Sequence, residues 1–217
     1  GLKKKVSQVY LHPSARDFRG CNTKILRQHL SGSVLRSSEA KGKQLLFRFS
    51  GNNWLGIHLG MSGKLSCVSL TKSRRDGSMA FKQDKHDHLV LIQARQALVF
   101  NDYRMFGRIR FQQGAEVPQW WKSISPALIS NAFDRVALKA YLTRRRRSPI
   151  KGVLFAQERF PGLGNWMVDE ILWRARIQPH CHAGRIGGKK LNDLFHAIKE
   201  VCRDALEVIG KDWGDPP

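Results

Sequence analysis

The sequence PGLGN, at positions 161–165, has the composition of a phosphate-binding turn. Asn165 is a good N-cap for a helix that follows, and the two glycines would let a partner approach the backbone closely. Exposed amide N–H groups at such a helix start attract anions. The same pattern also fits an ordinary connection between two helices, so it does not identify a site by itself.

The charge of the chain narrows the choice of partner. Lys and Arg number 38 and Asp and Glu 17 among 217 residues, which gives a formal net charge of +21. This excess indicates an acidic partner, either a nucleic acid or an anionic membrane surface. No apolar run approaches the roughly 20 residues that span a bilayer, so nucleic acid is favoured over a membrane. A ribosomal or other housekeeping basic protein also fits the charge alone.

The four cysteines, Cys21, Cys67, Cys181 and Cys202, do not predict a metal site. None are spaced as C-x-x-C, the usual arrangement in a structural zinc site. Cys202 falls on the apolar face of a predicted helix and is interpreted as a small buried hydrophobe. We therefore expect no metal ion and no cofactor in this chain, and a reducing compartment.

The first half of the chain is predicted to be rich in β-strands. Runs of β-branched, aromatic and leucine residues, several of them separated by Gly and Asn, occupy residues 43–50, 54–59, 64–70, 88–93, 97–101 and 108–112. The polar segment 71–85 lacks periodicity and is expected to be a mobile loop. Gly114, Pro118 and Pro126 interrupt residues 113–130, which are predicted to connect a first domain, 1–112, to a second, 131–217.

The second half is predicted to be helical. Candidate helices cover residues 131–142, 149–157 and 166–176, and Pro149 suits a first helical position. Between residues 191 and 209 apolar residues recur at three- and four-residue steps, which is typical of one helix face. Gly210 is expected to end that helix.

Ordered stretches of the chain resemble one family of DNA repair enzymes. They are KGKQLL at 41–46, HLGMSG at 58–63, KHDH at 85–88 with NDYRMFG at 101–107, and the stretch from Ile150 through PGLGNWMVDEILWRARIQP to Pro179. Together they resemble the formamidopyrimidine-DNA glycosylase and endonuclease VIII family. HLGMSG is identical to the family sequence, and DYRMFG resembles its DPRRFG. The resemblance implies an α+β fold: an N-terminal antiparallel β-sandwich, incomplete at its start, followed by a helical domain with a helix–two-turn–helix motif. DNA would lie in the cleft between them.

The resemblance also implies which residues replace a flipped base. A glycosylase takes its target base out of the stack, and another group must then fill the hole. By resemblance these void-filling residues are Met61, Arg104 and Phe106. Met can fill an irregular gap, Phe can wedge between base pairs, and Arg can donate hydrogen bonds to the unpaired base. Without the resemblance, Met61 and Phe106 would be interpreted as ordinary core residues.

Phosphate contacts are expected from residues in the same matched stretches: Lys43, His58, His86, Arg147, Lys151 and Asn165. Such contacts position a duplex without reading its sequence. A run of four arginines, as at 144–147, is more often a solvated basic face, but Arg147 lies beside the matched Lys151. His86 has a structural histidine as its alternative interpretation.

The two ends of the chain depart from the family pattern. The family's nucleophile is an N-terminal Pro beside a Glu, whereas this chain begins GLKKK, and it ends without the zinc finger that the family commonly carries. Lys43 is the one catalytic position that matches. It is expected to stay protonated beside DNA phosphates and to be a poor substitute nucleophile. We expect this chain to lack lyase activity, and the same chain extended by its native N-terminal segment to have it.

The implied function is base-excision repair: a DNA glycosylase with AP lyase activity that binds and flips oxidised bases in duplex DNA. The expected partner is double-stranded DNA with a damaged base or an abasic site, bound by a monomer, without a membrane. The compartment would be the bacterial cytoplasm, with the nucleoid, or a eukaryotic nucleus. A noncatalytic relative that binds damaged DNA is the alternative. An RNA- or ribosome-binding protein sharing the helical motif would leave HLGMSG and Arg104 with Phe106 unexplained.

Overall fold

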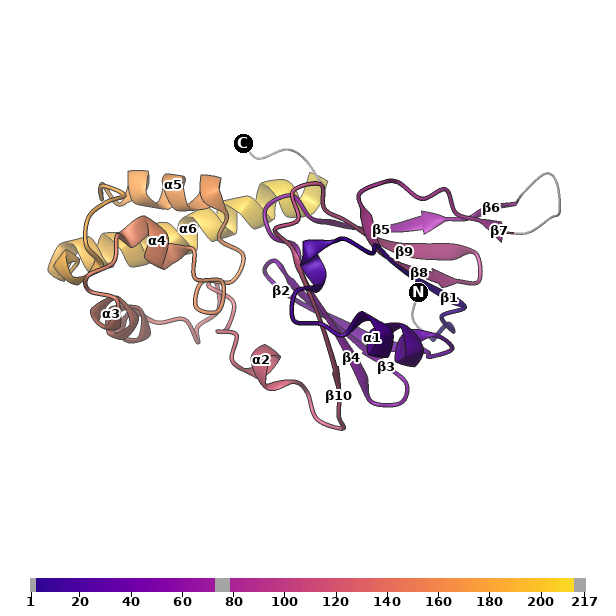
Figure 1. Cartoon of the computed structure of the whole chain (residues 1–217). Helices are drawn as coiled ribbons and strands as arrows, with labels where there is room; N and C mark the ends of the chain where they lie inside the picture. The colour runs from indigo at the N-terminus through magenta and orange to yellow at the C-terminus, as the bar shows by residue number, and fades with distance from the viewer. Residues whose placement is uncertain (1–2, 73–78, 213–217) are drawn as a thin grey trace. The chain divides into compact units, whose positions relative to one another are not determined.

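The computed structural model of the chain describes residues 3–72 and 79–212 (Figure 1). These residues belong to two compact units, 1–122 and 123–217. The boundary between Lys122 and Ser123 falls inside the segment 113–130. Among the described residues, none of the helices is both long enough and apolar enough to cross a membrane.

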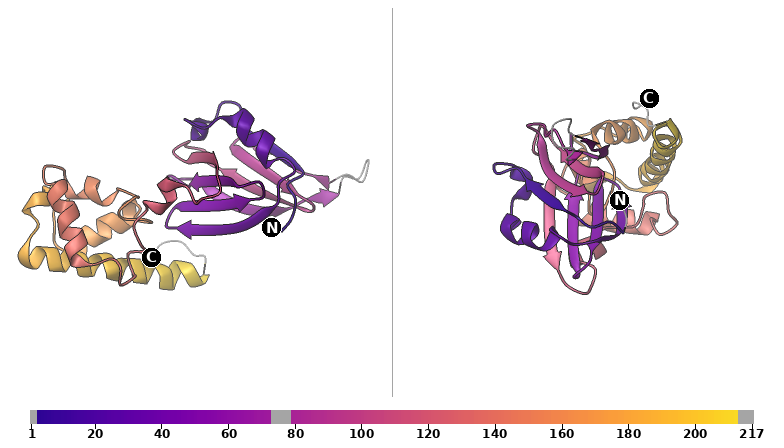
Figure 2. Two further views of the ribbon diagram at one scale, coloured as in Figure 1. Left: turned by 90° about the horizontal axis from the view of Figure 1, so that it is seen from below. Right: turned by 90° about the vertical axis from the view of Figure 1, so that its right-hand side faces the viewer.

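The first unit contains two four-stranded sheets in which every neighbouring pair is antiparallel (Figures 1 and 2). One sheet has the order β1 (Gln8–Leu11), β8 (Asp87–Gln93), β9 (Gln96–Asn101) and β5 (Lys64–Ser69). The other has the order β10 (Arg108–Gln113), β4 (Asn53–His58), β3 (Gln44–Phe49) and β2 (Leu35–Lys41). The core between the sheets takes alternate residues from both, such as Leu55 and Ile57 from β4 and Leu89 and Leu91 from β8. This packing of alternate apolar residues from two sheets is that of a β-sandwich.

The predicted strands and the observed ones agree within one or two residues at each end. The elements before residue 43 were not predicted: β1, the short turn η1 (Arg16–Phe18), α1 (Thr23–Leu30) and β2. Only one of the seven side chains of β2 is buried, so it carries no clear alternation. Within the expected loop 71–85, β6 (Thr71–Lys72) pairs with β7 (Met79–Ala80) in antiparallel orientation. Residues 73–78 of that loop lie outside the described part of the chain.

The second unit is helical, as expected, and its main elements are α3 (Arg135–Arg144), α4 (Ile150–Leu154), α5 (Asn165–Arg174) and α6 (Gly188–Asp212). A 3-10 turn, η2 (Ala183–Arg185), precedes α6. Their apolar faces enclose one core, to which α6 contributes Leu194, Ile198 and Val201. This unit and the sandwich together confirm the predicted α+β fold.

Helix ends differ from the prediction where a side chain or a turn decides the boundary. Helix α3 begins at Arg135 because the Asp134 carboxylate accepts a hydrogen bond from the Ala137 amide, 2.7 Å away. Helix α4 stops at Leu154, three residues before the predicted end. The long helix α6 runs past Gly210 to Asp212, so Gly210 does not end it. In α5 the N-cap is Gly164, and Asn165 is the first helical residue rather than the cap.

Candidate nucleic-acid interface

Two loops that cross between the sheets meet at one end of the sandwich. The loop after β4, residues 59–63, leads to β5 in the other sheet, and the loop after β9, residues 102–107, leads to β10. His58 at the end of β4 lies opposite Arg108 at the start of β10, and Lys64 at the start of β5 lies opposite Asn101 at the end of β9. The strand registers therefore bring both loops to the same end. Their sequences are those of HLGMSG and DYRMFG.

The glycines of these loops allow the two backbones to touch. Gly60 has φ +64°, and a Cβ added there would lie 2.6 Å from the Phe106 carbonyl carbon and 2.7 Å from the Gly107 nitrogen. A Cβ on Gly107 would lie 2.5 Å from Asp17 Oδ1 and 2.7 Å from the Phe100 ring. Because these neighbours are backbone or buried side chains, neither position accepts a larger residue without a shift.

The residues expected to fill a gap in the base stack, Met61, Arg104 and Phe106, stand on these loops and are exposed to solvent. Met61 is 63% exposed and Phe106 is 49% exposed, which contradicts their interpretation as ordinary core residues. The Arg104 guanidinium lies 4.9 Å from the centre of the Phe106 ring, a cation–π distance. Exposed large apolar side chains beside an arginine favour an interaction surface over a folding role.

The same end of the sandwich is strongly basic. Lys43 directly precedes β3, and its carbonyl accepts the Leu59 amide, which places it beside the HLGMSG loop. Burial lowers the pKa of Lys43 in the free protein, opposite in direction to the expected effect of DNA phosphates. Burial also lowers the pKa of His58, helped by the charges of Lys43, Arg110 and Arg19. A lowered pKa keeps His58 neutral at pH 7.

The protonation state of His58 fits a hydrogen-bond donor. Its Nδ1 accepts the Gly60 amide at 3.1 Å, so in the neutral ring Nε2 carries the proton. Arg19, which sequence reasoning missed, donates from its guanidinium to the Gly107 carbonyl at 2.9 Å. Arg110 was also missed, although the two-residue period of β10 and its pairing with β4 place it on the face that carries His58.

His86 lies beside the same loops. Its carbonyl accepts the Asp102 amide, and its ring meets Tyr103 edge to face at 6.4 Å between centres. Tyr103 is 61% exposed. The structure thus brings six expected residues to this end of the first unit: Lys43, His58, Met61, His86, Arg104 and Phe106.

In the second unit, the PGLGN turn is shaped by Gln157. Its side-chain amide donates to the Leu163 carbonyl at 2.6 Å and its Oε1 accepts the Gly162 amide at 3.2 Å. Gly162 has φ +94°, which the absence of a Cβ permits. The turn therefore enters α5 in a fixed conformation, with Asn165 exposed in the first turn of that helix.

One carboxylate holds two of the expected phosphate contacts. Asp169 Oδ1 lies 2.6 Å from Lys151 Nζ, and Asp169 Oδ2 accepts the Asn165 side-chain amide at 3.2 Å. Lys151 and Asn165 are thereby brought together at the start of α5. Arg147 lies exposed in the turn between α3 and α4, where Gly184 donates to the carbonyl of the neighbouring Arg146 at 3.1 Å.

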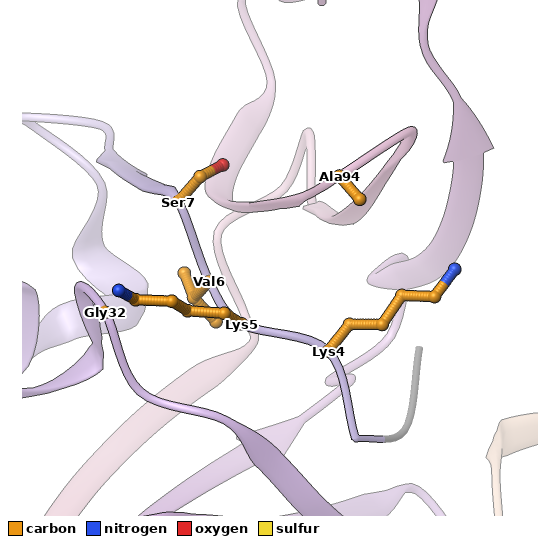
Figure 3. A pocket seen from close by; sticks show the side chains of 6 residues that line it. All are labelled: Lys4, Lys5, Val6, Ser7, Gly32 and Ala94. Carbon is orange, nitrogen blue, oxygen red and sulfur yellow. The ribbon is translucent and has the colours of Figure 1, made fainter.

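Side chains that bind metal ions do not cluster in the described residues. No group of three or more His, Cys, Asp or Glu side chains among them could hold a metal ion, and their four cysteines are free thiols. A cavity of about 680 Å³ lies along the chain's first residues, lined by Lys4, Lys5, Val6, Ser7, Gly32 and Ala94 (Figure 3). Lys4 and Lys5 extend in different directions there, and the expected site residues do not line it (Figure 3).

Comparison with known proteins gives one consistent family. Residues 2–109 match the model of the formamidopyrimidine-DNA glycosylase N-terminal domain, and residues 124–214 match that of the formamidopyrimidine-DNA glycosylase H2TH domain. The chain is similar to formamidopyrimidine-DNA glycosylases of Phenylobacterium zucineum (36% identity, 87% of this chain, 67% of the relative) and Cereibacter sphaeroides (34%, 88% and 68%).

Solved structures of a Lactococcus lactis formamidopyrimidine-DNA glycosylase are similar along nearly the whole chain. The complex bound non-covalently to DNA containing an AP site has a TM-score of 0.77 at 25% identity, covering 98% of this chain and 77% of that one. The complex with DNA containing FAPY-dG has a TM-score of 0.76 at 26% identity, covering 95% and 74%.

Proposed function

Because the chain belongs to the formamidopyrimidine-DNA glycosylase family, we propose that it binds duplex DNA at damaged bases and abasic sites, as a DNA glycosylase of base-excision repair. The solved relatives bound to AP-site and FAPY-dG DNA support this proposal. The expected partner is therefore double-stranded DNA, and the lesion it carries is an oxidised or missing base.

The observation that carries the proposal is the surface formed by the two crossing loops. Met61 and Phe106 are exposed apolar side chains with the Arg104 guanidinium beside them, and Lys43 and His58 lie next to the same loops. Apolar side chains can enter a gap in a base stack, and an arginine can donate to the base left without a partner. Lys43 and His58 would meet the phosphates on either side of such a gap.

The second unit would add contacts that do not depend on the lesion. Lys151 and Asn165 surround the start of α5, where unpaired backbone amides favour an anion. Arg147 adds a further exposed cation. These groups would bind the DNA backbone of any sequence, as a protein that searches for rare lesions requires.

AP lyase activity is the chemical part of the proposal. The reaction passes through an imine between an amine and the sugar, followed by elimination. Burial lowers the pKa of Lys43, which raises its neutral fraction, but a bound phosphate would favour the charged ammonium again. We propose that Lys43 assists base excision and elimination beside the reacting amine and does not itself form the imine.

Borohydride trapping on an abasic-site duplex tests this role of Lys43. In the full-length protein, the wild type and Lys43→Gln should give the same measurable yield of covalent adduct, and residues 1–217 alone are expected to give none. An adduct that forms with the unchanged protein and disappears in Lys43→Gln would make Lys43 the nucleophile and contradict the proposal.

A noncatalytic relative that binds damaged DNA is the second candidate, since the same surface would serve it. Measuring release of the damaged base from a formamidopyrimidine-containing duplex distinguishes a glycosylase from a noncatalytic relative. We expect the full-length protein to release the base, and tight lesion binding without release would favour the noncatalytic alternative. For either candidate we propose that the described residues act without a metal ion. The compartment would be the one that holds the DNA: the bacterial cytoplasm, or the nucleus in a eukaryote.

A further inference from the structure

Behind the exposed loops, the side chain of Asp102 is completely buried. It lies at the end of β9, at the start of the loop that carries Arg104 and Phe106. Ser62 in the other loop donates its hydroxyl to Asp102 Oδ1. Gly107 donates its backbone amide to Asp102 Oδ2 at 2.7 Å, and the Arg104 amide approaches Oδ1 at 3.4 Å. One carboxylate thus connects both loops.

Each group that Asp102 holds belongs to, or directly adjoins, a void-filling residue. Ser62 follows Met61, and Gly107 follows Phe106. The third group is the backbone amide of Arg104 itself. The close approach of Gly60 to Phe106 and Gly107 leaves little room for the loops to move separately. The same carboxylate therefore contacts groups next to Met61 and Phe106 and the backbone of Arg104 itself.

A carboxylate suits this position better than its amide. The groups that hydrogen-bond to it from the two loops are all donors: the Ser62 hydroxyl and the backbone amides of Gly107 and, at longer range, Arg104. The buried carboxyl of Asp17 also interacts with Asp102, and burial raises the pKa of Asp17, which favours its protonated, donating form. An ionised carboxylate is purely an acceptor, whereas an amide replaces one oxygen with a donor. Burial raises the pKa of Asp102, but the hydrogen bonds from Ser62 and the Gly107 amide outweigh it, so the pKa is lower than usual. Asp102 is thus charged at neutral pH, and hydrogen bonds to a charged acceptor are stronger than neutral ones.

We propose that Asp102 is a positioning residue for lesion recognition. It holds Met61, Arg104 and Phe106 in the arrangement that enters the gap left by a flipped or missing base, with Ser62 as its link to the Met61 loop. It does not touch DNA, so its loss should reduce selectivity for the lesion while leaving contacts to undamaged backbone in place. The proposal rests on the proposed function.

The test compares binding to two duplexes that differ only in a tetrahydrofuran abasic-site analogue. The readout is the ratio of the Kd for the intact duplex to the Kd for the analogue duplex. Asp102→Asn should lower this ratio about tenfold, as expected when hydrogen bonds to a charged group are lost, and keep the Kd for intact DNA within about twofold. Ser62→Ala should lower the ratio by a smaller factor, because the Gly107 amide still binds the carboxylate.

Asp134→Ala is the matched control for a general loss of stability. It removes a carboxylate that caps α3 in the other unit, so it should lower the Tm and leave the ratio unchanged. If Asp102→Asn fails to fold, Ser62→Ala decides, since it removes a single hydroxyl from a loop. An unchanged ratio in the folded variants would overturn the inference, as would an equal fall in Asp134→Ala. A wild-type protein that binds both duplexes equally would instead refute the proposed function.

Discussion

Replacing Gly60 by alanine tests whether the contact between the two loops is as tight as the structure indicates. Gly60 has φ +64°, where a residue with a Cβ is disfavoured by about 1–2 kcal/mol. The new Cβ would lie 2.6 Å from the Phe106 carbonyl carbon, and such overpacking costs about 1–3 kcal/mol. We expect the two effects together to destabilise the first unit by about 3 kcal/mol.

The assay is thermal unfolding followed by circular dichroism, together with the binding ratio for abasic and intact duplexes. A loss of about 3 kcal/mol corresponds to a fall in Tm of about 6–12 °C for a chain of this size. The ratio should also fall, because Phe106 moves with its carbonyl. The control is Gly152→Ala in α4, where a Cβ would meet no atom within 4 Å and should stabilise the helix slightly. A Gly60→Ala protein with unchanged Tm and unchanged ratio would refute the close contact.

The remaining predictions separate lesion contacts from phosphate contacts. Arg104→Ala and Met61→Ala should weaken discrimination between abasic and intact duplexes more than they weaken overall affinity for DNA. Lys151→Ala should weaken overall affinity more than discrimination. A Met61→Ala protein that is destabilised yet still discriminates would make Met61 a core residue. Asp169→Asn should tighten binding to intact duplex about fivefold at low salt, because a negative charge near the phosphate is removed. The gain in affinity should shrink at high salt. Unchanged or weaker binding would mean that Asp169 mainly orients Lys151. Lys151→Ala should reduce the slope of log Kd against log salt concentration by about 0.9, because one phosphate contact by a cation is lost. His58→Gln at pH 7 should leave this slope unchanged, because the lowered pKa makes His58 neutral. A reduced slope in His58→Gln would show that the histidine is charged.

Much of the fold could be predicted because its central strands are short apolar runs bounded by polar residues and glycines. Strands β4 and β8 are buried along nearly their whole length, so they stand out in the sequence as runs of apolar residues. The N-terminal elements lack such a signal. Strand β2 is mostly exposed, and α1 has eight residues whose start depends on Asn22 accepting the Lys24 and Ile25 amides.

The candidate site could likewise be predicted only in part from the sequence. The motifs indicated the exposed residues Met61, Arg104 and Phe106, because they resemble a known family. They did not indicate the partners that hold them, since a buried acceptor such as Asp102 is defined by donors distant in sequence. In the same way, the lowered pKa of Lys43 follows from burial, and the pairing of Lys151 follows from α5 packing beside α4.

The most direct measurement of the central claim is the affinity of the protein for matched duplexes with and without an abasic-site analogue, at two salt concentrations. We expect tighter binding to the analogue duplex at both salt concentrations. We also expect a steep loss of affinity with salt for both duplexes, because each neutralised phosphate releases counterions. Equal affinity for the two duplexes would contradict lesion recognition by Met61, Arg104 and Phe106, even if binding to DNA remained strong.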